Sequence, residues 1–222
     1  LFGSICIVFG VLSTLGYHGA IILPKKDLEA LKILNLCLIS LILITILSAM
    51  IVGLGKDLIA IKFNSPQLSK LLWMLPFFVF FHGIYQIFHA WNVRLMKFGN
   101  LAKSKITEII TKKFYQLGAG LLGLTTGYNL IIANLLGSIT KIFVLFQNIN
   151  LTSIKNTFSI DIYEVAKRYR KFPMYSLWGE FISRILAVII SFLIIKYFGN
   201  DLLGHYALSI LVLSLPSSLI SG

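Results

Sequence analysis

Long apolar stretches separated by short polar ones run through the whole 222-residue chain. A helix needs about 20 apolar residues to cross the hydrocarbon core of a bilayer. Stretches of suitable length, the first and last cut short by the ends of the chain, lie at about 1–16, 31–54, 70–93, 106–126, 129–147, 175–197 and 204–222. Alternation with period two is too brief to predict a transmembrane barrel. We therefore predict an all-α integral membrane protein, a polytopic bundle of about seven transmembrane helices. Because the chain begins and ends within apolar stretches, we expect it to be the middle of a longer protein.

The stretch at 106–126 has two different faces. On a helix, apolar residues would share one face and polar residues the opposite one: Ile106, Ile109, Ile110, Phe114 and Leu117 against Glu108, Lys112 and Gln116. One interpretation is a helix lying on the membrane surface. We favour a crossing helix, because removing it would put the second and third basic segments on opposite sides of the membrane. Its polar face would then point into the protein or into a wet cavity.

The composition agrees with a membrane location. Hydrophobic residues make up 57% of the chain and charged residues 13%, and the mean hydropathy is +0.88. Soluble domains are about 45–50% apolar and about 25% charged. The net charge of +12 would suggest nucleic-acid binding in a soluble protein. Here the basic residues lie between apolar stretches, which is how membrane topology is encoded, so we expect no nucleic-acid partner.

The basic residues are concentrated in alternate connections. Fourteen of the twenty lie in or just beyond the segments 17–32, 94–105 and 149–173, and only four lie in the connections between them. By the positive-inside rule, the three basic segments are predicted to face the cytoplasm. The remaining two basic residues, Lys141 and Arg184, lie inside predicted helices.

Several passages resemble a known family. In LSTLGYHGAIILPKKDLEALKILNLCLI (12–39), an apolar helix leads into an A-I-x-L-P-K loop and then a Leu-rich helix. In MLPFFVFFHGIYQIFHAWNVRLMKFGNLAKSKI (74–106), a helix with an early Pro, a Tyr-Gln pair and a Trp leads into basic residues. RKFPMYSLWGEFIS (170–183) and IIKYFGNDLLGHYALSILVLSLP (194–216) resemble the next two helices of the same proteins. The family is that of the bacterial O-antigen and polysaccharide flippases, in the multidrug/oligosaccharidyl-lipid/polysaccharide exporter superfamily.

The resemblance implies about twelve to fourteen helices in two lobes around a central cavity. Residues 1–148 would supply about helices two to six of the first lobe. Residues 149–173 would form the cytoplasmic linker between the lobes, and residues 174–222 the first two helices of the second lobe. The expected location is the bacterial inner membrane.

The activity that the resemblance implies is transport by alternating access, with no enzymatic step and no cofactor. The substrate would be a polyprenyl-diphosphate-linked oligosaccharide, moved from the inner to the outer leaflet for surface polysaccharide biosynthesis (O-antigen, capsule or exopolysaccharide). Membrane lipids and other polysaccharide assembly proteins are the further expected partners.

A flippase needs a polar lining for sugar and diphosphate, and side chains three or four residues apart share a helix face. Polar stripes of this kind occur on four predicted helices. The candidate cavity-lining, substrate-binding residues are His82, Gln86 and His89, beside Tyr85; Glu108, Lys112 and Gln116; Asn134 and Lys141; and Glu180 and Arg184. Arg184 and Lys141 are expected to offer positive charge to the diphosphate.

Glu180 and Arg184 lie four residues apart in an otherwise apolar helix. A charge at the bilayer centre costs about 2.5–3.5 kcal/mol even on the lenient insertion scale. We therefore expect both to face the interior, with Glu180 holding Arg184 in position when the cavity is empty. The alternative is that Glu180 lies at the membrane interface and Arg184 snorkels or pairs for structural reasons. For the histidines, the alternative is a hydrogen-bonded core position, and metal binding is not expected.

No catalytic or metal-binding motif occurs in the sequence. It has no Gly-rich phosphate loop and no HExxH motif, and Cys6 and Cys37 have the spacing of neither a disulfide framework nor a zinc site. Two other functions stay open. A cation-coupled drug exporter of the same superfamily would favour acidic residues in the first lobe, whereas the embedded residues here are largely basic and amide. A membrane-embedded polymerase or glycosyltransferase would need a large extramembrane loop, and the longest here is about 26 residues.

Overall fold

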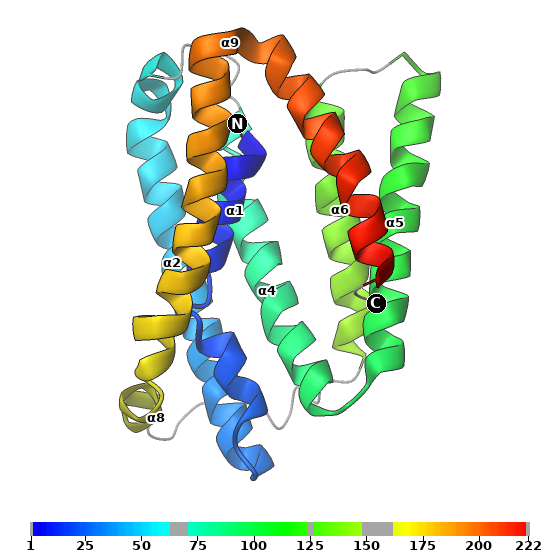
Figure 1. The fold of residues 1–222 in the computed structure, drawn as a ribbon. Coiled ribbons are helices and arrows are strands. Elements are labelled where there is room, and N and C mark those ends of the chain that lie inside the picture. Colours follow the sequence, from blue (N-terminus) through cyan, green and yellow to red (C-terminus); the bar gives the residue numbers. More distant parts are fainter. Residues whose placement is uncertain (1, 63–70, 124–126, 148–161, 221–222) are drawn as a thin grey trace.

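The computed structural model describes residues 2–62, 71–123, 127–147 and 162–220, and within these ranges all regular structure is helical. The long helices lie roughly side by side in one bundle (Figure 1). They are α1 (Phe2–Leu12), α2 (Asp27–Lys62), α4 (Leu75–Arg94), α5 (Phe98–Leu121), α6 (Gly127–Phe146) and α9 (Leu177–Ile220). Three short elements join them: the 3₁₀-helix η1 (Tyr17–Ile22), α8 (Ile162–Arg168) and the π-helix η2 (Phe172–Ser176). The predicted all-α bundle is confirmed.

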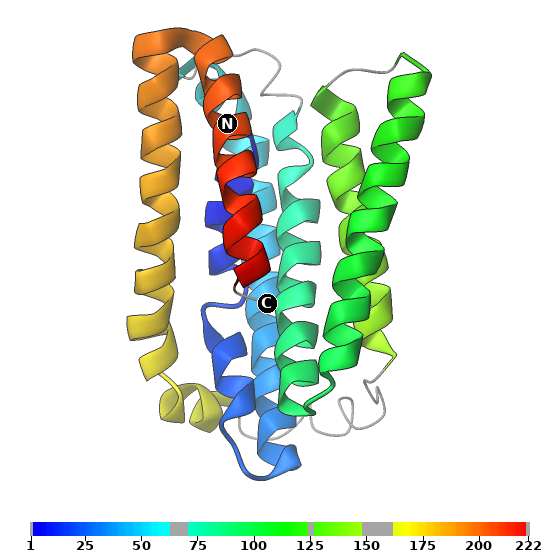
Figure 2. The same ribbon diagram turned by 45° about the vertical axis from the view of Figure 1, so that its right-hand side comes forward.

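α9 consists of two helices that meet at a sharp break. Gly199 has φ 86° and ψ 175°, a conformation that residues with a side chain rarely adopt. The chain reverses there, so the part before Gly199 and the part after it run in opposite directions (Figures 1 and 2). These parts correspond to the predicted helices at 175–197 and 204–222, of which residues 221–222 lie outside the described residues.

Successive long helices run in alternate directions, so their connections gather at two ends of the bundle. The lower end in Figure 1 holds η1, the turn between α4 and α5, and α8, and we call it the basic end. It contains the described parts of all three basic segments. Residues 148–161, which include most of the predicted linker 149–173, lie outside the described residues. The bundle thus puts the described basic segments together, and their cytoplasmic location stays a prediction.

The segment predicted as a loop at 94–105 is almost entirely helical, so this prediction is wrong. α4 continues to Arg94 and α5 begins at Phe98. The chain turns within the three residues between them, where Met96 has φ 52°. Lys103 and Lys105 therefore lie on exposed faces of the first turns of α5, where lysine is a good helix former.

The first basic segment is also shorter as a loop than predicted. α1 ends at Leu12 because Leu15 and Gly16, with φ 49° and 74°, turn the chain out of the helix. α2 then begins at Asp27, inside the predicted 17–32 loop. Two carboxylates in its first turn stabilise the positive end of the helix dipole.

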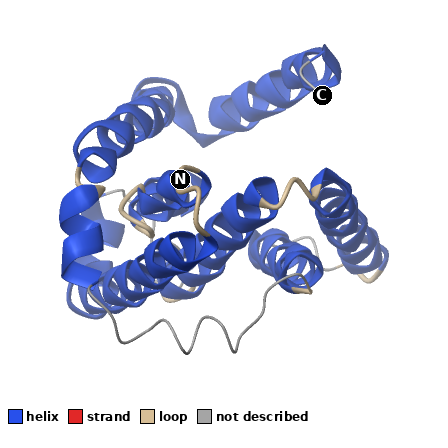
Figure 3. Cartoon of the chain, turned by 90° about the horizontal axis from the view of Figure 1, so that it is seen from below, coloured by secondary structure: helices blue, strands red, loops and turns tan. Residues whose placement is uncertain are grey.

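α4 lies in the middle of the first six elements and contacts α1, α2, α5, α6 and η1. Figure 3 shows the bundle from the basic end, with the helices seen obliquely. One apolar cluster lies where α2, α4, η1 and α8 meet and includes Ile21, Leu34 and Ile87. A second joins α1, α2 and α4 and includes Cys6 and Val79.

Apolar side chains also cover much of the outside of the bundle. Leu54, Phe114 and Leu121 are each more than 80% exposed. Among the described residues, the helices Asp27–Lys56, Gly127–Phe146 and Phe172–Gly199 are long and apolar enough to cross a membrane. The polar stripes of α4 and α5 make them less apolar, but both lie alongside those helices. Such an exterior is compatible with lipid and not with water.

Candidate functional site

α5 turns its polar face toward α6 and its apolar face outward. Glu108 is only 4% exposed, whereas Ile110 and Phe114 are 60% and 81% exposed. This is the reverse of an amphipathic helix on a soluble protein. α5 also lies antiparallel alongside α6 (Figure 2). The structure therefore favours the predicted bundle helix over the surface helix.

Glu108 stands at the centre of three lysines, and we call these four residues the lysine cluster. Its Oε1 accepts from Lys112 Nζ at 2.6 Å and from Lys141 Nζ at 3.3 Å. Its Oε2 accepts from Lys105 Nζ at 3.3 Å. Lys141 comes from α6 and is buried, Lys112 is partly buried, and Lys105 reaches solvent. Three of the predicted site residues, Glu108, Lys112 and Lys141, are thus brought together from two helices.

A glycine on α6 allows this close approach. A Cβ at Gly137 would lie 2.6 Å from Lys112 Cγ and 3.1 Å from the Glu108 carbonyl oxygen. Small residues at such points let two membrane helices approach closely. The absence of a side chain at Gly137 therefore gives Lys112 its path to the carboxylate.

α4 joins the lysine cluster through Tyr85. Lys141 Nζ lies 3.8 Å from the centroid of the Tyr85 ring. A cation–π contact of this kind is worth about 2 kcal/mol when it is desolvated. On the other side, the Tyr85 ring lies 5.5 Å from the ring of His89, centroid to centroid. Sequence reasoning placed Tyr85 on the polar stripe but not among the binding residues, and its spacing from His82 and His89 was the available signal.

Gln86, on the same α4 stripe, accepts hydrogen bonds from the two residues that follow α1. Gln86 Oε1 accepts from the hydroxyls of Ser13 at 3.2 Å and Thr14 at 3.3 Å. Gln86 Nε2 lies 3.4 Å from His82 Nε2, and the Thr14 hydroxyl lies 2.8 Å from His18 Nδ1. The contact with Gln86 agrees with the core alternative for His82. Nothing in the sequence pattern marks Ser13 and Thr14 as site residues, since hydroxyl residues are common in apolar helices.

Two further candidates lie nearer the other end of the bundle. Gln116 follows Lys112 by one turn of α5 and is half-buried. Asn134 donates through Nδ2 to the Leu130 carbonyl of its own helix at 2.9 Å. Neither forms a hydrogen bond to the lysine cluster in the described part of the chain, so their predicted contact with substrate stays a prediction.

Glu180 and Arg184 lie on the first half of α9, and both are exposed. Within residues 162–220 no ion pair joins them, so the expected pairing is not formed. Arg184 lies within electrostatic range of His82, and Glu180 within range of His18. The two charges therefore act on different elements, α4 for Arg184 and η1 for Glu180.

No group of three or more His, Cys, Asp or Glu side chains is placed to hold a metal ion in the part of the chain that the structure describes.

Comparison with known proteins gives one match. The sequence fits the profile of a family described as "Polysaccharide biosynthesis protein" over residues 2–222, which include every helix described above. No curated protein and no solved structure matches.

Proposed function

Because the chain belongs to the polysaccharide biosynthesis protein family, we propose that it carries a polyprenyl-diphosphate-linked oligosaccharide from the inner to the outer leaflet of the bacterial inner membrane. Family membership establishes a role in polysaccharide biosynthesis, and the helical bundle is that of a membrane protein. The transport step, its direction and the substrate are the proposal. Under it, the basic end of the bundle faces the cytoplasm.

The observation that supports this proposal best is the charge of the lysine cluster. Three ammonium groups surround one carboxylate, which leaves two positive charges in surplus. Lys105 is well solvated, but Lys112 and Lys141 lie in the body of the bundle. Surplus buried charge is costly unless an anion balances it. A diphosphate diester, which is doubly negative at neutral pH, has the charge that this cluster lacks.

Lys141 is the residue best placed to change partners. Its ammonium has two neighbours, the Glu108 carboxylate and the Tyr85 ring, and a phosphate oxygen would be a stronger partner than the ring. The charge of Arg184 reaches the same region from α9. A diphosphate between the two lobes would therefore meet cationic groups from both.

The competing functions are less well supported. A cation-coupled exporter needs a buried carboxylate that is free to take up a cation. Glu108 is the most buried acidic side chain among the described residues, and it is already held by three lysines. The geometry therefore suits an anionic substrate better than a cationic one.

The proposal is tested by locating the lipid-linked oligosaccharide in cells. In a strain lacking the gene, the glycan should be protected from an added, membrane-impermeant glycosidase, and the wild-type gene should restore cleavage. Lys141→Met and Arg184→Ala should lower transfer about tenfold or more at equal protein level, which corresponds to about 1.4 kcal/mol. Lys113→Met is the matched control, because Lys113 follows Lys112 directly and is exposed.

Three other outcomes would each contradict one part of the proposal. Normal outer-leaflet delivery without the gene would exclude the transport function. Failure to assemble the glycan at all would indicate an enzyme. Wild-type transfer by Lys141→Met would remove the lysine cluster from the mechanism.

A further inference from the structure

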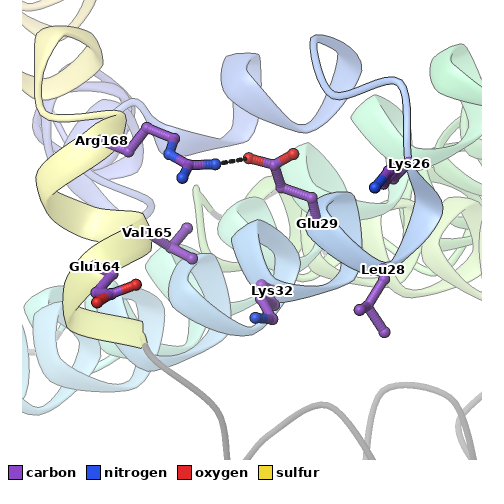
Figure 4. A pocket seen from close by; sticks show the side chains of 7 residues that line it. All are labelled: Lys26, Leu28, Glu29, Lys32, Glu164, Val165 and Arg168. Carbon is purple, nitrogen blue, oxygen red and sulfur yellow. Dashed lines mark hydrogen bonds and ion pairs between the residues drawn. The ribbon is translucent and has the colours of Figure 1, made fainter.

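The short helix α8 is fixed to the corner formed by η1 and the start of α2. Glu29 Oε1 accepts from Arg168 Nη1 at 2.7 Å and from the Tyr169 hydroxyl at 3.1 Å. Figure 4 shows Arg168 reaching Glu29 beside a pocket of about 200 Å³ that Glu164 and Val165 also line. Partial burial and the bond to Glu29 raise the pKa of Tyr169, so its hydroxyl stays protonated and remains a donor.

Apolar contacts also hold α8, on the same face as Arg168, which follows Val165 by about one turn. Val165 is 7% exposed and belongs to the same apolar cluster as Tyr17 and Leu34. The Tyr17 hydroxyl also donates to the Ala166 carbonyl at 3.5 Å. The described end of the predicted linker is therefore packed as part of the first lobe.

The chain between α8 and α9 is the π-helix η2. The Leu177 amide bonds to the Phe172 carbonyl, which gives the wide i→i+5 turn. Pro173 lies in this turn and has no backbone N–H to donate. Single π-turns of this kind often occur at functional positions in helices.

η2 lies against two glycines, which we call the glycine seat. A Cβ at Gly16 would lie 3.5 Å from Leu177 Cβ and 3.5 Å from the Phe172 carbonyl oxygen. A Cβ at Gly19 would lie 3.4 Å from Phe172 Cε1. Gly16 also has φ 74°, which favours glycine. The start of α9 thus rests on backbone, with no side chain between them.

Beyond the seat, α9 packs mainly on a single helix. It contacts α1, but none of the apolar window in Phe172–Gly199 is buried. α8, which is hydrogen-bonded to Glu29, is therefore followed at once by an irregular turn against two glycines and then by a helix that packs mainly on α1. Hinges in proteins are short segments of this type that connect two packed bodies.

We infer that η2 is the pivot between the two lobes: α9 turns about Phe172–Ser176 on the glycine seat, while Glu29 keeps α8 fixed to the first lobe. This inference rests on the proposed transport function, because alternating access requires the lobes to move relative to each other. It assigns η2 and the seat a mechanical role and no contact with substrate.

A reversible disulfide tests the pivot directly. The Cβ separation at Gly16 and Leu177 is within the range of disulfides, about 3.5–4.5 Å. In the protein expressed from its gene, the pair Gly16→Cys and Leu177→Cys should crosslink on oxidation. Transfer of the lipid-linked oligosaccharide should then fall at least about tenfold and recover with a reductant. The reduced double variant is the control for folding, and each single cysteine variant is the control for the oxidant.

A graded substitution gives a second test that needs no crosslink. Gly19→Ala should transfer at the wild-type rate, since its methyl group would be in ordinary contact with Phe172. Gly19→Leu cannot fit without moving Phe172, so transfer should fall while protein level is kept.

The attachment of α8 to Glu29 is tested with two glutamates that line the same pocket, Glu29 and Glu164. Glu29→Gln should weaken both hydrogen bonds, speed backbone hydrogen exchange in residues 162–176 and lower transfer. Glu164→Gln should change neither, because Glu164 has no ion pair among the described residues. The charge-swapped pair Glu29→Arg and Arg168→Glu should recover part of the loss.

Full crosslinking with undiminished transfer would overturn the pivot, because Gly16 and Leu177 would not need to move. Failure to crosslink at all would overturn the seat on which the inference is built. Both results presuppose wild-type transfer. Absence of transfer in the wild type would instead reject the proposed function.

Discussion

Lys112 of α5 occupies the space that a side chain at Gly137 of α6 would need. The distance from a Cβ at position 137 to Lys112 Cγ would be 2.6 Å, which no pair of non-bonded carbons tolerates. The Glu108 carbonyl oxygen would lie 3.1 Å from the same Cβ, so part of the obstacle is backbone that cannot move as a side chain does. The absence of a side chain at Gly137 therefore links two features. They are the ion pair between Lys112 and Glu108 and the packing of α5 on α6.

Gly137→Ala is expected to force α5 and α6 apart or to displace Lys112 from Glu108. Overpacking of this kind costs about 1–3 kcal/mol. Thermal unfolding in detergent should show a lower midpoint, and transfer should fall. Gly120→Ala on α5 is the matched control, since nothing lies within 4 Å of a Cβ there. Equal midpoints for the two variants would contradict the close approach at Gly137.

Glu108→Gln is expected to be among the most destabilising single changes in the bundle. It removes the counter-charge of three lysines, and breaking a buried pair costs about 3–5 kcal/mol. Adding Lys141→Met should recover part of this loss, because the more buried of the unbalanced ammonium groups is then gone. A double-mutant cycle on unfolding midpoints should give a coupling of about 1–3 kcal/mol. Strictly additive effects would show that Glu108 and Lys141 do not interact.

The sequence was sufficient to predict the helices and to place Glu108, Lys112 and Lys141 on inward polar stripes, but not to predict that Lys141 would join Glu108 from another helix. A charged side chain in an apolar helix must find a partner, and residues four apart on α5 share one face. It could not predict that Tyr85 would lie under Lys141, because that contact depends on how α4 and α6 cross. It also suggested a pair between Glu180 and Arg184 that does not form. Helical spacing allows an ion pair but does not decide which neighbours compete for each charge.

The helix boundaries at the basic end show a second limit of prediction from sequence. The charge pattern predicts a loop at 94–105, yet Lys103 and Lys105 lie on helix α5. Composition marks which residues are near the membrane surface and does not mark where a helix begins. The turn itself is set by Met96 with its positive φ, which is not readable from its side chain. Similarly, α8 could be recognised as docked only once Val165 and Glu29 were placed together.

Arg94 is expected to contribute more to the stability of the fold than its ion-pair partner, Asp27. Its guanidinium donates to the carbonyls of Ile21 and Pro24 and to Asp27 Oδ1 at 2.8 Å. The side chain of Arg94 is 9% exposed, whereas that of Asp27 is 78% exposed. Arg94→Lys keeps the charge but loses the planar guanidinium that donates to several acceptors at once. It should lower the free energy of unfolding by about 1–3 kcal/mol. Asp27→Asn removes only an exposed pair and should cost about 1 kcal/mol or less. Equal shifts of the unfolding midpoint would contradict this order.

The outward face of α5 is expected to contact lipid if the helix crosses the membrane. Phe114 and Leu117 are 81% and 67% exposed, whereas Lys112 is turned toward α6. Nitroxide labels at positions 114 and 117 should therefore be relaxed strongly by oxygen, which concentrates in the hydrocarbon, and weakly by a water-soluble nickel chelate. The exposed Lys103 near the start of α5 is the control, and a label there should show the opposite preference because it lies at the basic end. Strong relaxation by nickel at both 114 and 117 would mean that this face meets water, and α5 would then not be a lipid-facing transmembrane helix.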